Sequence, residues 1–518
     1  MPDGFDPNAD WVGFERGPMK LGAVACGNPD AAEAGVEILQ RGGNAIDAVI
    51  ATAFAMGVVE PLDSGLGAGG FMTVHHARTK TTTTLDFMGT APASAGYDLY
   101  QAVNPLGDYT ILVKDRANEI GHRSVAVPGA AAGLCRALDT FGQMPLKSVM
   151  APAIRMARDG FTVAPKAALR MSRTQDMLSY MPATAAMLLK PDGSLFEAGD
   201  RMDMSEYGNS LELIAEEGPR AFYEGELGAR IVEELQAHGG FMTADDLASY
   251  HVVRRAAAGG LYRGRRIATM GPPSTGFMVA NGLAALDAAG VPEDDHGRVR
   301  ALAGAMLATF NARRRGLGDP AFVPSPLSPG IAPGGESAET TSLCAMDAAG
   351  NAACITFSNN NHSAVVVPGT GILLNNQMRL FHAWEGSANS VVGGKRPASS
   401  MMPTLLFEDG RAAMAIGASG ATRIVTALMQ ILFHHLGREV PLEKAVREAR
   451  VHAEEDQMMC DPDIADTARA VADELGLALT VNAVRDPMMA VCQTIAVDSD
   501  GTAVAVGDPR ARAQGRVV

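Results

Sequence analysis

The chain lacks any long run of positive charge. Its 43 Lys and Arg residues are outnumbered by 58 Asp and Glu residues, which gives a formal net charge of −15. The basic segments RGRR at 263–266 and RRR at 313–315 are too short to form a basic tract. Binding to nucleic acid or to an anionic membrane depends on such tracts, so the composition argues against both classes of partner.

The chain also lacks a long hydrophobic run and a recognisable targeting segment. Its first ten residues, MPDGFDPNAD, contain neither a basic stretch nor an apolar core, so they do not resemble a signal peptide. The longest apolar stretch, AVIATAFAMGVV at 48–59, is too short to span a bilayer and is expected to be a buried helix. We therefore expect a cytoplasmic protein with no membrane partner.

Cysteine and metal-binding patterns are sparse. Six cysteines are scattered without CxxC spacing, at positions 26, 135, 344, 354, 460 and 492, and are expected to be reduced and mostly buried. Adjacent histidines at 75–76 and 434–435 could not both point at one ion without strain, and no HExxH motif occurs. The sequence therefore predicts no metal site and no cofactor.

What the sequence does contain is two strand-rich regions at opposite ends of the chain. Residues 29–41 and 44–59 predict helices, and after SGLGAGG the segments FMTVHHA and TTTTLDFM predict strands. A helix-rich middle is expected over about 128–320. Later strands are predicted in SLCAMD, AACITFS, GILLNN, MPTLLFEDGRAAMAIGA and QTIAVDSDGTAVAVGD, with helices at 421–436 and 440–449. This order indicates stacked sheets covered by helices on both outer faces.

Two familiar motifs fail on their context. GLGAGG at 65–70 satisfies the dinucleotide-binding pattern GxGxxG, but a predicted helix precedes it and a predicted strand follows, which reverses the required order. GASGA at 417–421 misses the nucleophile-elbow pattern GxSxG by one glycine. Neither a dinucleotide-binding fold nor a serine hydrolase is expected.

The segment ETTSLCAMDAAGNAACITFSNN follows a loop rich in Gly and Pro, PSPLSPGIAPGGESA. Threonines often begin strands, which would explain Thr340 and Thr341 without any chemistry. Alternatively, attack of the Thr340 hydroxyl on the Glu339 carbonyl could cut the chain there. Thr340 would then carry a free α-amino group, with a pKa near ~7.7–8.0, beside its own nucleophilic hydroxyl. The residues alone leave both interpretations open.

Ten further motifs, in order, make the chain similar to the γ-glutamyltransferases of the N-terminal-nucleophile hydrolase superfamily. They are NPDAAEAGVEILQRGGNAIDAVIATAFAMGVVEP, SGLGAGGFM, VPGAAAG, MTADDLASY, GPPSTG, GDPAF, LLNNQM, KRPASSMMPT, GASGATR and GDPR. The resemblance implies an α+β fold, the four-layer αββα sandwich. It also implies autocleavage into a large chain, 1–339, and a small chain, 340–518, which stay together as a heterodimer in one structural unit; a dimer of heterodimers is one further option.

The resemblance assigns roles by position. Thr340 falls on the nucleophile, and Ser358 falls on a threonine whose hydroxyl assists cleavage. Gly420 and Ala421 fall on two backbone N–H donors of the oxyanion hole, and an alanine at 421 should preserve its N–H if its φ is negative. The positions that bind the ends of the substrate's amino-acid group are matched by Asn360, Gln377, Ser399 and Ser400.

Departures from the family pattern concern the charged contacts. Met88 stands where an arginine usually holds the glutamyl carboxylate, and Leu380 stands where an aspartate usually pairs with the α-ammonium, with Arg379 beside it. The family pattern TTH-x-S is also replaced here by TTSLC, a change expected to be tolerated by packing. An ammonium buried without its anion costs several kcal/mol. We therefore expect Met88 and Leu380 to line a less polar acyl pocket and Arg379 to hold a carboxylate elsewhere on the substrate, unless Met88 and Leu380 turn away from the pocket.

Together these observations predict a self-processing N-terminal-threonine amidohydrolase. It would cleave a small amide through an acyl-enzyme on Thr340, with water or an amine as acceptor, and its acyl group would not be γ-glutamyl. Two alternatives remain. One is an ordinary γ-glutamyltransferase or glutathione hydrolase with rearranged recognition. The other is an uncleaved, non-catalytic binding protein on the same scaffold.

Overall fold

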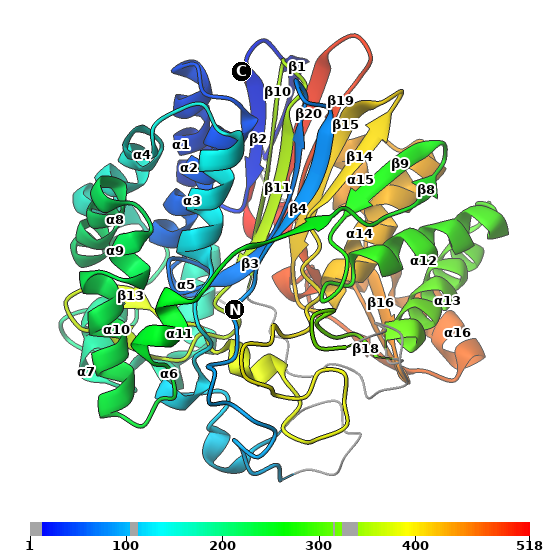
Figure 1. Ribbon diagram of the computed structural model, residues 1–518. Helices are drawn as coiled ribbons and strands as arrows, with labels where there is room; N and C mark the ends of the chain where they lie inside the picture. Colours follow the sequence, from blue (N-terminus) through cyan, green and yellow to red (C-terminus); the bar gives the residue numbers. More distant parts are fainter. Residues whose placement is uncertain (1–12, 104–111, 314–315, 324–339) are drawn as a thin grey trace.

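Two seven-stranded antiparallel sheets stack face to face between two helical layers (Figure 1). The computed structural model describes residues 13–103, 112–313, 316–323 and 340–518. One sheet has the strand order β1 (Phe14–Pro18), β20 (Thr502–Gly507), β19 (Val491–Val497), β15 (Arg411–Ser419), β14 (Thr404–Glu408), β9 (Arg265–Thr269) and β8 (Leu261–Tyr262). The other has the order β21 (Gln514–Val517), β2 (Gly22–Cys26), β10 (Thr341–Asp347), β11 (Ala352–Ser358), β3 (Gly69–His76), β4 (Thr81–Phe87) and β7 (Val253–Ala256).

The helical layer on the left in Figure 1 covers the sheet that contains β10 and β11. Its longer helices are α1 (Pro29–Gln40), α2 (Ala45–Val59), α3 (Ala130–Phe141), α4 (Leu146–Asp159), α8 (Ser205–Glu217) and α10 (Glu226–Ala237). Its shorter helices are α5 (Pro165–Arg173), α6 (Gln175–Leu178), α7 (Pro182–Leu188), α9 (Arg220–Tyr223) and α11 (Ala244–Ala248). The layer on the right covers the other sheet with α12 (Gly276–Ala289), α13 (Asp295–Arg313), α14 (Arg423–Leu432), α15 (Leu442–Arg447) and α16 (Ala465–Leu475).

Small strand pairs complete the layers. They are β5 (Phe161–Thr162) with β6 (Arg201–Met202), β12 (Val366–Val367) with β13 (Ile372–Leu373), and a three-stranded sheet of β16 (Val451–Glu454), β17 (Gln457–Cys460) and β18 (Ala478–Val481). The long apolar run of the sequence is α2, and all fifteen of its residues are buried. Asn44 caps this helix in a reciprocal capping box with Asp47, which fixes where the helix begins.

The two sheets approach closely because the residues between them are small. The core that they share contains Ala23, Ala25, Cys344, Cys354, Ala415 and Ala505, among others. At Gly417 on β15, a Cβ atom would lie 2.2 Å from the Ser342 Oγ and 2.8 Å from the Cys354 Sγ of the facing sheet. A side chain at this position would therefore push the sheets apart.

The αββα prediction is confirmed, as are the helices at α1 and α2 and the strands β3, β4, β10, β11, β14, β15, β19 and β20. The prediction of a helix-rich middle is incomplete, because β7, β8 and β9 lie within it and form one edge of each sheet. These strands are short, and β7 and β9 carry exposed arginines, so the apolar alternation that marks a strand is weak there. The predicted cleavage loop and Glu339 lie outside the described residues.

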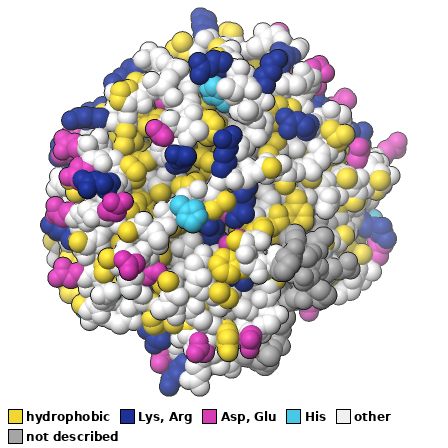
Figure 2. Space-filling model, viewed as in Figure 1, with side chains coloured by type: hydrophobic (Ala, Val, Ile, Leu, Met, Phe, Trp, Pro, Cys, Tyr) yellow, Lys and Arg dark blue, Asp and Glu magenta, His cyan; other side chains and the backbone are white. Residues whose placement is uncertain are grey.

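The face seen in Figure 2 carries Lys and Arg side chains interspersed with Asp and Glu side chains. Among the described helices, none combines the length and apolar character that crossing a bilayer requires. The prediction for the cysteines is confirmed: all six are unpaired and buried. Burial raises the pKa of the Cys26 thiol to about 12, so it stays protonated at neutral pH.

Candidate active site

Thr340 directly precedes β10 and lines a small cavity. The cavity has a volume of about 20 Å³, which is room for roughly one water molecule. The side chains around it come from loops, strand ends, the short helix Gln377–Leu380 and the start of α14. They are Thr340, Ser358, Asn360, Gln377, Leu380, Ser399, Met401, Ala421 and Ile424. None of these described side chains carries a charge. Seven of them were predicted as site residues, so the fold brings those predicted residues to one place.

Ser358 ends β11, the strand that pairs with β10, so the ladder itself sets Ser358 beside Thr340. The Asn360 N–H donates a hydrogen bond to the Ser358 Oγ at 2.8 Å, which leaves the Ser358 hydroxyl proton for another acceptor. Asn360 has a φ of +57°, in the left-handed region that asparagine tolerates best after glycine. Its Nδ2 donates to the Asn376 Oδ1 at 2.9 Å, which fixes the orientation of the amide.

Gln377 holds three backbone segments together. Its Oε1 accepts from the Gly89 N–H at 2.8 Å, and its Nε2 donates to the carbonyls of Ser358 at 2.8 Å and Gly69 at 3.3 Å. A Cβ on Gly69 would lie 2.8 Å from the Gln377 Oε1, so the glycine-rich SGLGAGG motif serves close packing of the chain. The predicted contact of Gln377 with substrate stays a prediction, and it would compete with these bonds.

Gly420 and Ala421 form the turn between β15 and α14. Gly420 has a φ of +139°, and a Cβ there would lie 2.7 Å from the Ala490 Cα, so only glycine fits. Ala421 has a φ of +54°, so the condition of a negative φ that was attached to its role is not met. Such a backbone costs about 1–3 kcal/mol and is tolerated where the surroundings enforce it. Within the described residues, the two N–H groups donate to no protein acceptor, as an oxyanion-binding pair requires.

A buried ion network, which the sequence analysis did not select, supports this turn from behind. Arg450 donates to the carbonyls of Met489 and Ala490, and Ala490 packs against Gly420. The Asp508 carboxylate accepts from the Arg450 Nη2 at 2.6 Å and also pairs with Arg510. Burial would raise the pKa of Asp508, but the charges of Arg450 and Arg510 outweigh it, and the pKa lies below its usual value. The GDPR motif was the available signal for this network.

The two serines differ in their placement. Ser399 lines the cavity, and its Oγ accepts from the Met401 N–H at 3.2 Å. Its backbone is tied to the loop before α12, because the Ser399 N–H donates to the Pro273 carbonyl at 3.0 Å. Ser400 is buried but does not line the cavity, so the structure separates the pair that the sequence predicted to act together.

Of the two departures from the family pattern, only one reaches the cavity. Leu380 lines it, as predicted. Met88 does not, because its side chain is fully buried in an apolar cluster that also contains Phe71, Leu380 and Met401. The prediction that Met88 lines the pocket is therefore corrected: it lies in the wall behind the cavity surface. Met401 lines the cavity, but the sequence analysis did not select it, although it stands in the KRPASSMMPT motif.

Arg379 has an acidic partner of its own. Its Nη1 lies 3.2 Å from the Glu119 Oε1, and Glu119 also pairs with Arg116 at 3.1 Å. Burial would raise the pKa of Glu119, but hydrogen bonds from Arg116 and the charge of Arg379 lower it below its usual value. A substrate carboxylate would have to compete with Glu119 for Arg379, and Arg379 does not line the cavity.

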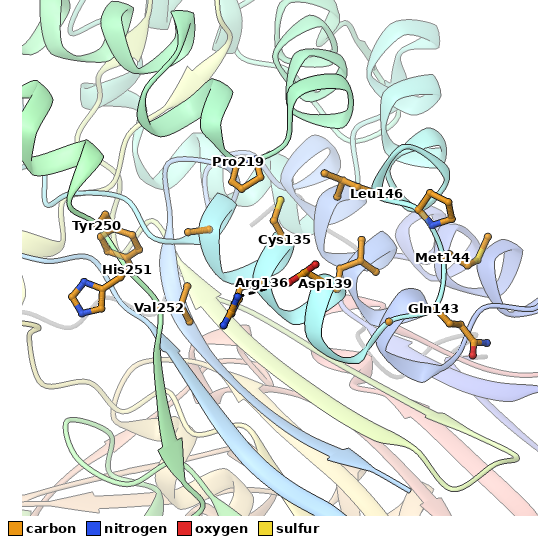
Figure 3. A pocket seen from close by; sticks show the side chains of 14 residues that line it. Cys135, Arg136, Asp139, Gln143, Met144, Leu146, Pro219, Tyr250, His251 and Val252 are labelled. Atoms are coloured by element: carbon orange, nitrogen blue, oxygen red, sulfur yellow. Dashed lines mark ion pairs between the residues drawn. The ribbon is translucent and has the colours of Figure 1, made fainter. Parts of the chain in front are cut away.

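A much larger pocket, of about 950 Å³, lies elsewhere, beside α3 (Figure 3). Cys135, Arg136 and Asp139 come from α3 on one side, and Tyr250, His251 and Val252 come from the segment before β7 on the other. Arg136 and Asp139 pair with each other at 3.8 Å. The pocket contains none of the residues around Thr340.

The chain is similar to known proteins over nearly its whole length. The profile of the family described as Gamma-glutamyltranspeptidase matches residues 31–518. The chain is 35% identical to the Acylase ACY 1 proenzyme of Pseudomonas sp. (strain SE83), over 93% of this chain and 90% of that protein. It is 30% identical to the Glutathione hydrolase proenzyme of Escherichia coli (strain K12), over 95% and 90%. The crystal structure of cephalosporin acylase from Bacillus halodurans superimposes with a TM-score of 0.86 at 25% identity, over 97% and 96% of the two chains.

Proposed function

The chain belongs to the γ-glutamyltranspeptidase family, and from this premise we propose that it is a self-processing amidohydrolase whose acyl substrate lacks an α-amino group. The observation that carries the proposal is the neutral wall of the Thr340 cavity, where no described side chain is charged. The acylase relative supports the same direction.

Processing would begin with Thr340 itself. Its Oγ1 attacks the Glu339 carbonyl, the acyl group moves from nitrogen to oxygen, and water then hydrolyses the ester. The products are chains 1–339 and 340–518, which remain paired because β10 lies between β2 of the first chain and β11 of the second. The Ser358 hydroxyl, which accepts from the Asn360 N–H, would donate its proton toward the reacting groups.

Turnover would use the amine that processing exposes. The Thr340 α-amino group, with a pKa near ~7.7–8.0, takes the proton of its own hydroxyl while the Oγ1 attacks the substrate carbonyl. The N–H groups of Gly420 and Ala421 donate hydrogen bonds to the developing oxyanion, and such a donor is worth about 2.7–4 kcal/mol. The amine part of the substrate takes this proton and leaves. Water or another amine then attacks the acyl-enzyme and releases the acyl group from Thr340.

Specificity follows from what the cavity wall offers. Leu380, Met401 and Ile424 are apolar, and Asn360, Gln377 and Ser399 offer only neutral hydrogen bonds, each worth roughly 0.5–1.5 kcal/mol. A substrate ammonium desolvated against this wall would lose more than these groups return. An acyl chain without that charge avoids the cost.

The second candidate is a γ-glutamyl hydrolase or transferase with rearranged recognition. It is favoured by the ion pair of Glu119 with Arg379, the chain neighbour of Leu380, which brings together one charge of each sign. If this pair opened for substrate, Glu119 could hold an ammonium and Arg379 a carboxylate. The glutathione hydrolase relative is consistent with this alternative.

A matched substrate pair separates the two candidates. γ-Glutamyl p-nitroanilide and glutaryl p-nitroanilide differ only in the α-amino group and release the same chromophore. We expect kcat/KM to be at least about tenfold higher for the glutaryl compound, equivalent to about 1.4 kcal/mol. Equal or better turnover of the γ-glutamyl compound would favour the second candidate.

A further inference from the structure

Three potential metal-ligating side chains converge at the outer end of α10, away from the Thr340 cavity. The His122 Nε2 lies 2.8 Å from the Glu234 Oε1, and the His238 Nδ1 lies 3.1 Å from the same oxygen. The three atoms all lie within 4.8 Å of one another. We propose that His122, Glu234 and His238 form a binding site for one divalent transition-metal ion, of which Zn²⁺ is the reference case.

The donor set selects the class of ion. Two imidazole nitrogens and one carboxylate oxygen suit Zn²⁺, Co²⁺ or Ni²⁺, whereas Mg²⁺ and Ca²⁺ prefer oxygen ligands. Ligands at 2.0–2.2 Å around a tetrahedral ion lie roughly 3.4 Å apart. The two distances to Glu234 are close to this value. The His238 Nδ1 also lies 3.0 Å from the Glu234 carbonyl oxygen, so binding requires the exposed His238 ring to turn away from that carbonyl and out of its stack on His122. A water molecule can complete the coordination.

The backbone holds the three groups in place. Glu234 and His238 are four residues apart on α10 and at its C-cap, which puts them on one helix face. His122 begins the short helix His122–Ser124, and its ring stacks on that of His238 with centroids 4.5 Å apart. The His122 side chain is 7% exposed and that of His238 is 55% exposed, so one side of the site is buried and the other is open to solvent.

A bound ion would link α10 to the segment around Glu119 and Gly121, which contacts residues next to the Thr340 cavity. The Gly121 N–H donates to the Ser363 carbonyl at 2.7 Å, and the Glu119 carbonyl accepts from the Asn376 Nδ2 at 2.7 Å. Asn376 in turn orients Asn360. A bound ion should therefore reduce hydrogen exchange in residues 116–124. Sequence spacing could not indicate this site, because His122 and Glu234 are 112 residues apart.

The test uses full-length, tag-free protein treated with a chelator. Titration with Zn²⁺ by calorimetry, and with Co²⁺ by visible absorption, should show one equivalent per chain. His238→Ala and Glu234→Ala should each weaken binding by at least about tenfold, since even the loss of a group that only orients a ligand costs 10–100-fold. His238→Ala changes a largely exposed side chain, so this variant should fold.

The matched control is His296→Ala. His296 also pairs with a glutamate, Glu474, at 3.5 Å, but it has no second histidine in reach within the described part of the chain. This variant should bind Zn²⁺ as the unaltered protein does. The proposal is overturned if the unaltered protein binds neither ion stoichiometrically, or if His238→Ala and Glu234→Ala bind with unchanged affinity.

Discussion

The cavity at Thr340 and the pocket beside α3 differ in size and in chemistry, and the reacting groups lie in the smaller of the two. The pocket beside α3 has about 950 Å³, within the range of about 300–1,000 Å³ usual for small-molecule sites, whereas the cavity at Thr340 has about 20 Å³. Only the small cavity combines a nucleophile, a neighbouring hydroxyl and a turn with two N–H donors. Volume therefore does not locate the candidate active site here; the convergence of reacting groups does.

The charged side chains near the small cavity do not line it. Around the small cavity, charged groups stand behind the wall: Asp508 and Arg450 behind the Gly420 turn, and Asp86 with Arg255 near Met88. Burial raises the pKa of Asp86 although Arg396 and Arg255 oppose it. These pairs hold loops in place, and the surface that would meet the acyl group stays neutral.

The largest expected effect concerns Thr340. Thr340→Ala should abolish both processing and turnover, because one hydroxyl serves both reactions. Intact-mass analysis of the unaltered protein should show two chains, and N-terminal sequencing of the smaller should read TTSLC. The variant should remain one chain and release no p-nitroaniline.

Thr341→Val is the matched control for this prediction. The Thr341 Oγ1 is buried with no hydrogen-bond partner among the described residues, so replacing its hydroxyl by a methyl removes an unsatisfied group. Processing should be unchanged, and the free energy of unfolding should stay equal or rise by about 1 kcal/mol. If Thr341→Val were the inactive variant and Thr340→Ala the active one, the nucleophile would be wrong by one residue.

The second largest effect concerns the network behind the turn. Asp508→Asn leaves Arg450 without its paired carboxylate in a buried site, while Arg510 keeps its pair with Asp461, and the free energy of unfolding should fall by about 3–5 kcal/mol. Denaturant unfolding at pH 7 measures this loss. Asp463→Asn is the control, because Asp463 is half exposed where it pairs with Arg485, and it should cost less than about 1 kcal/mol.

The loss of stability in Asp508→Asn should depend on pH. Because the pKa of Asp508 is lowered in the folded state, its contribution to stability is present above the unfolded pKa of about 3.9 and is lost as the pH falls through the folded value. The gap between the unaltered protein and Asp508→Asn should therefore narrow below about pH 4. A gap that stays constant down to acid unfolding would contradict the assigned role.

A smaller effect is expected at the wall of the small cavity. Leu380→Asp places an anion where the wall is neutral and should raise the ratio of kcat/KM for γ-glutamyl over glutaryl p-nitroanilide by at least about tenfold. Met88→Arg is the weaker variant, because Met88 is fully buried and a charge there would be desolvated. Leu380→Asn controls for polarity without charge. An unchanged ratio in Leu380→Asp would show that the acyl group does not meet Leu380.

The sequence predicted the residues that line the Thr340 cavity better than the contacts that hold those residues in place. Thr340, Ser358 and Ala421 were found because motifs carry them, and strand pairing brings them together as expected. The left-handed backbone of Ala421 could not be predicted, because it depends on packing around Gly420 and Ala490. The bonds of Gln377 to Gly69 and Gly89 were equally hidden, since they join segments about 290–310 residues apart. The strands β7, β8 and β9 were missed because they are short and because β7 and β9 carry exposed arginines.

The smallest expected effect tests whether the two cavities are independent. Tyr250 lines the large pocket, and its hydroxyl donates to the Met88 carbonyl at 2.8 Å, behind the wall of the small cavity. Tyr250→Phe keeps the stacking on Tyr223 and removes one hydrogen bond. The free energy of unfolding should therefore fall by about 0.5–1.5 kcal/mol. The substrate ratio should change by less than about threefold, and Arg136→Ala, at the solvent side of the pocket, should change neither quantity. A change in the ratio as large as that of Leu380→Asp would show that the large pocket controls the acyl site through Met88, and the two cavities would then have to be regarded as one functional unit.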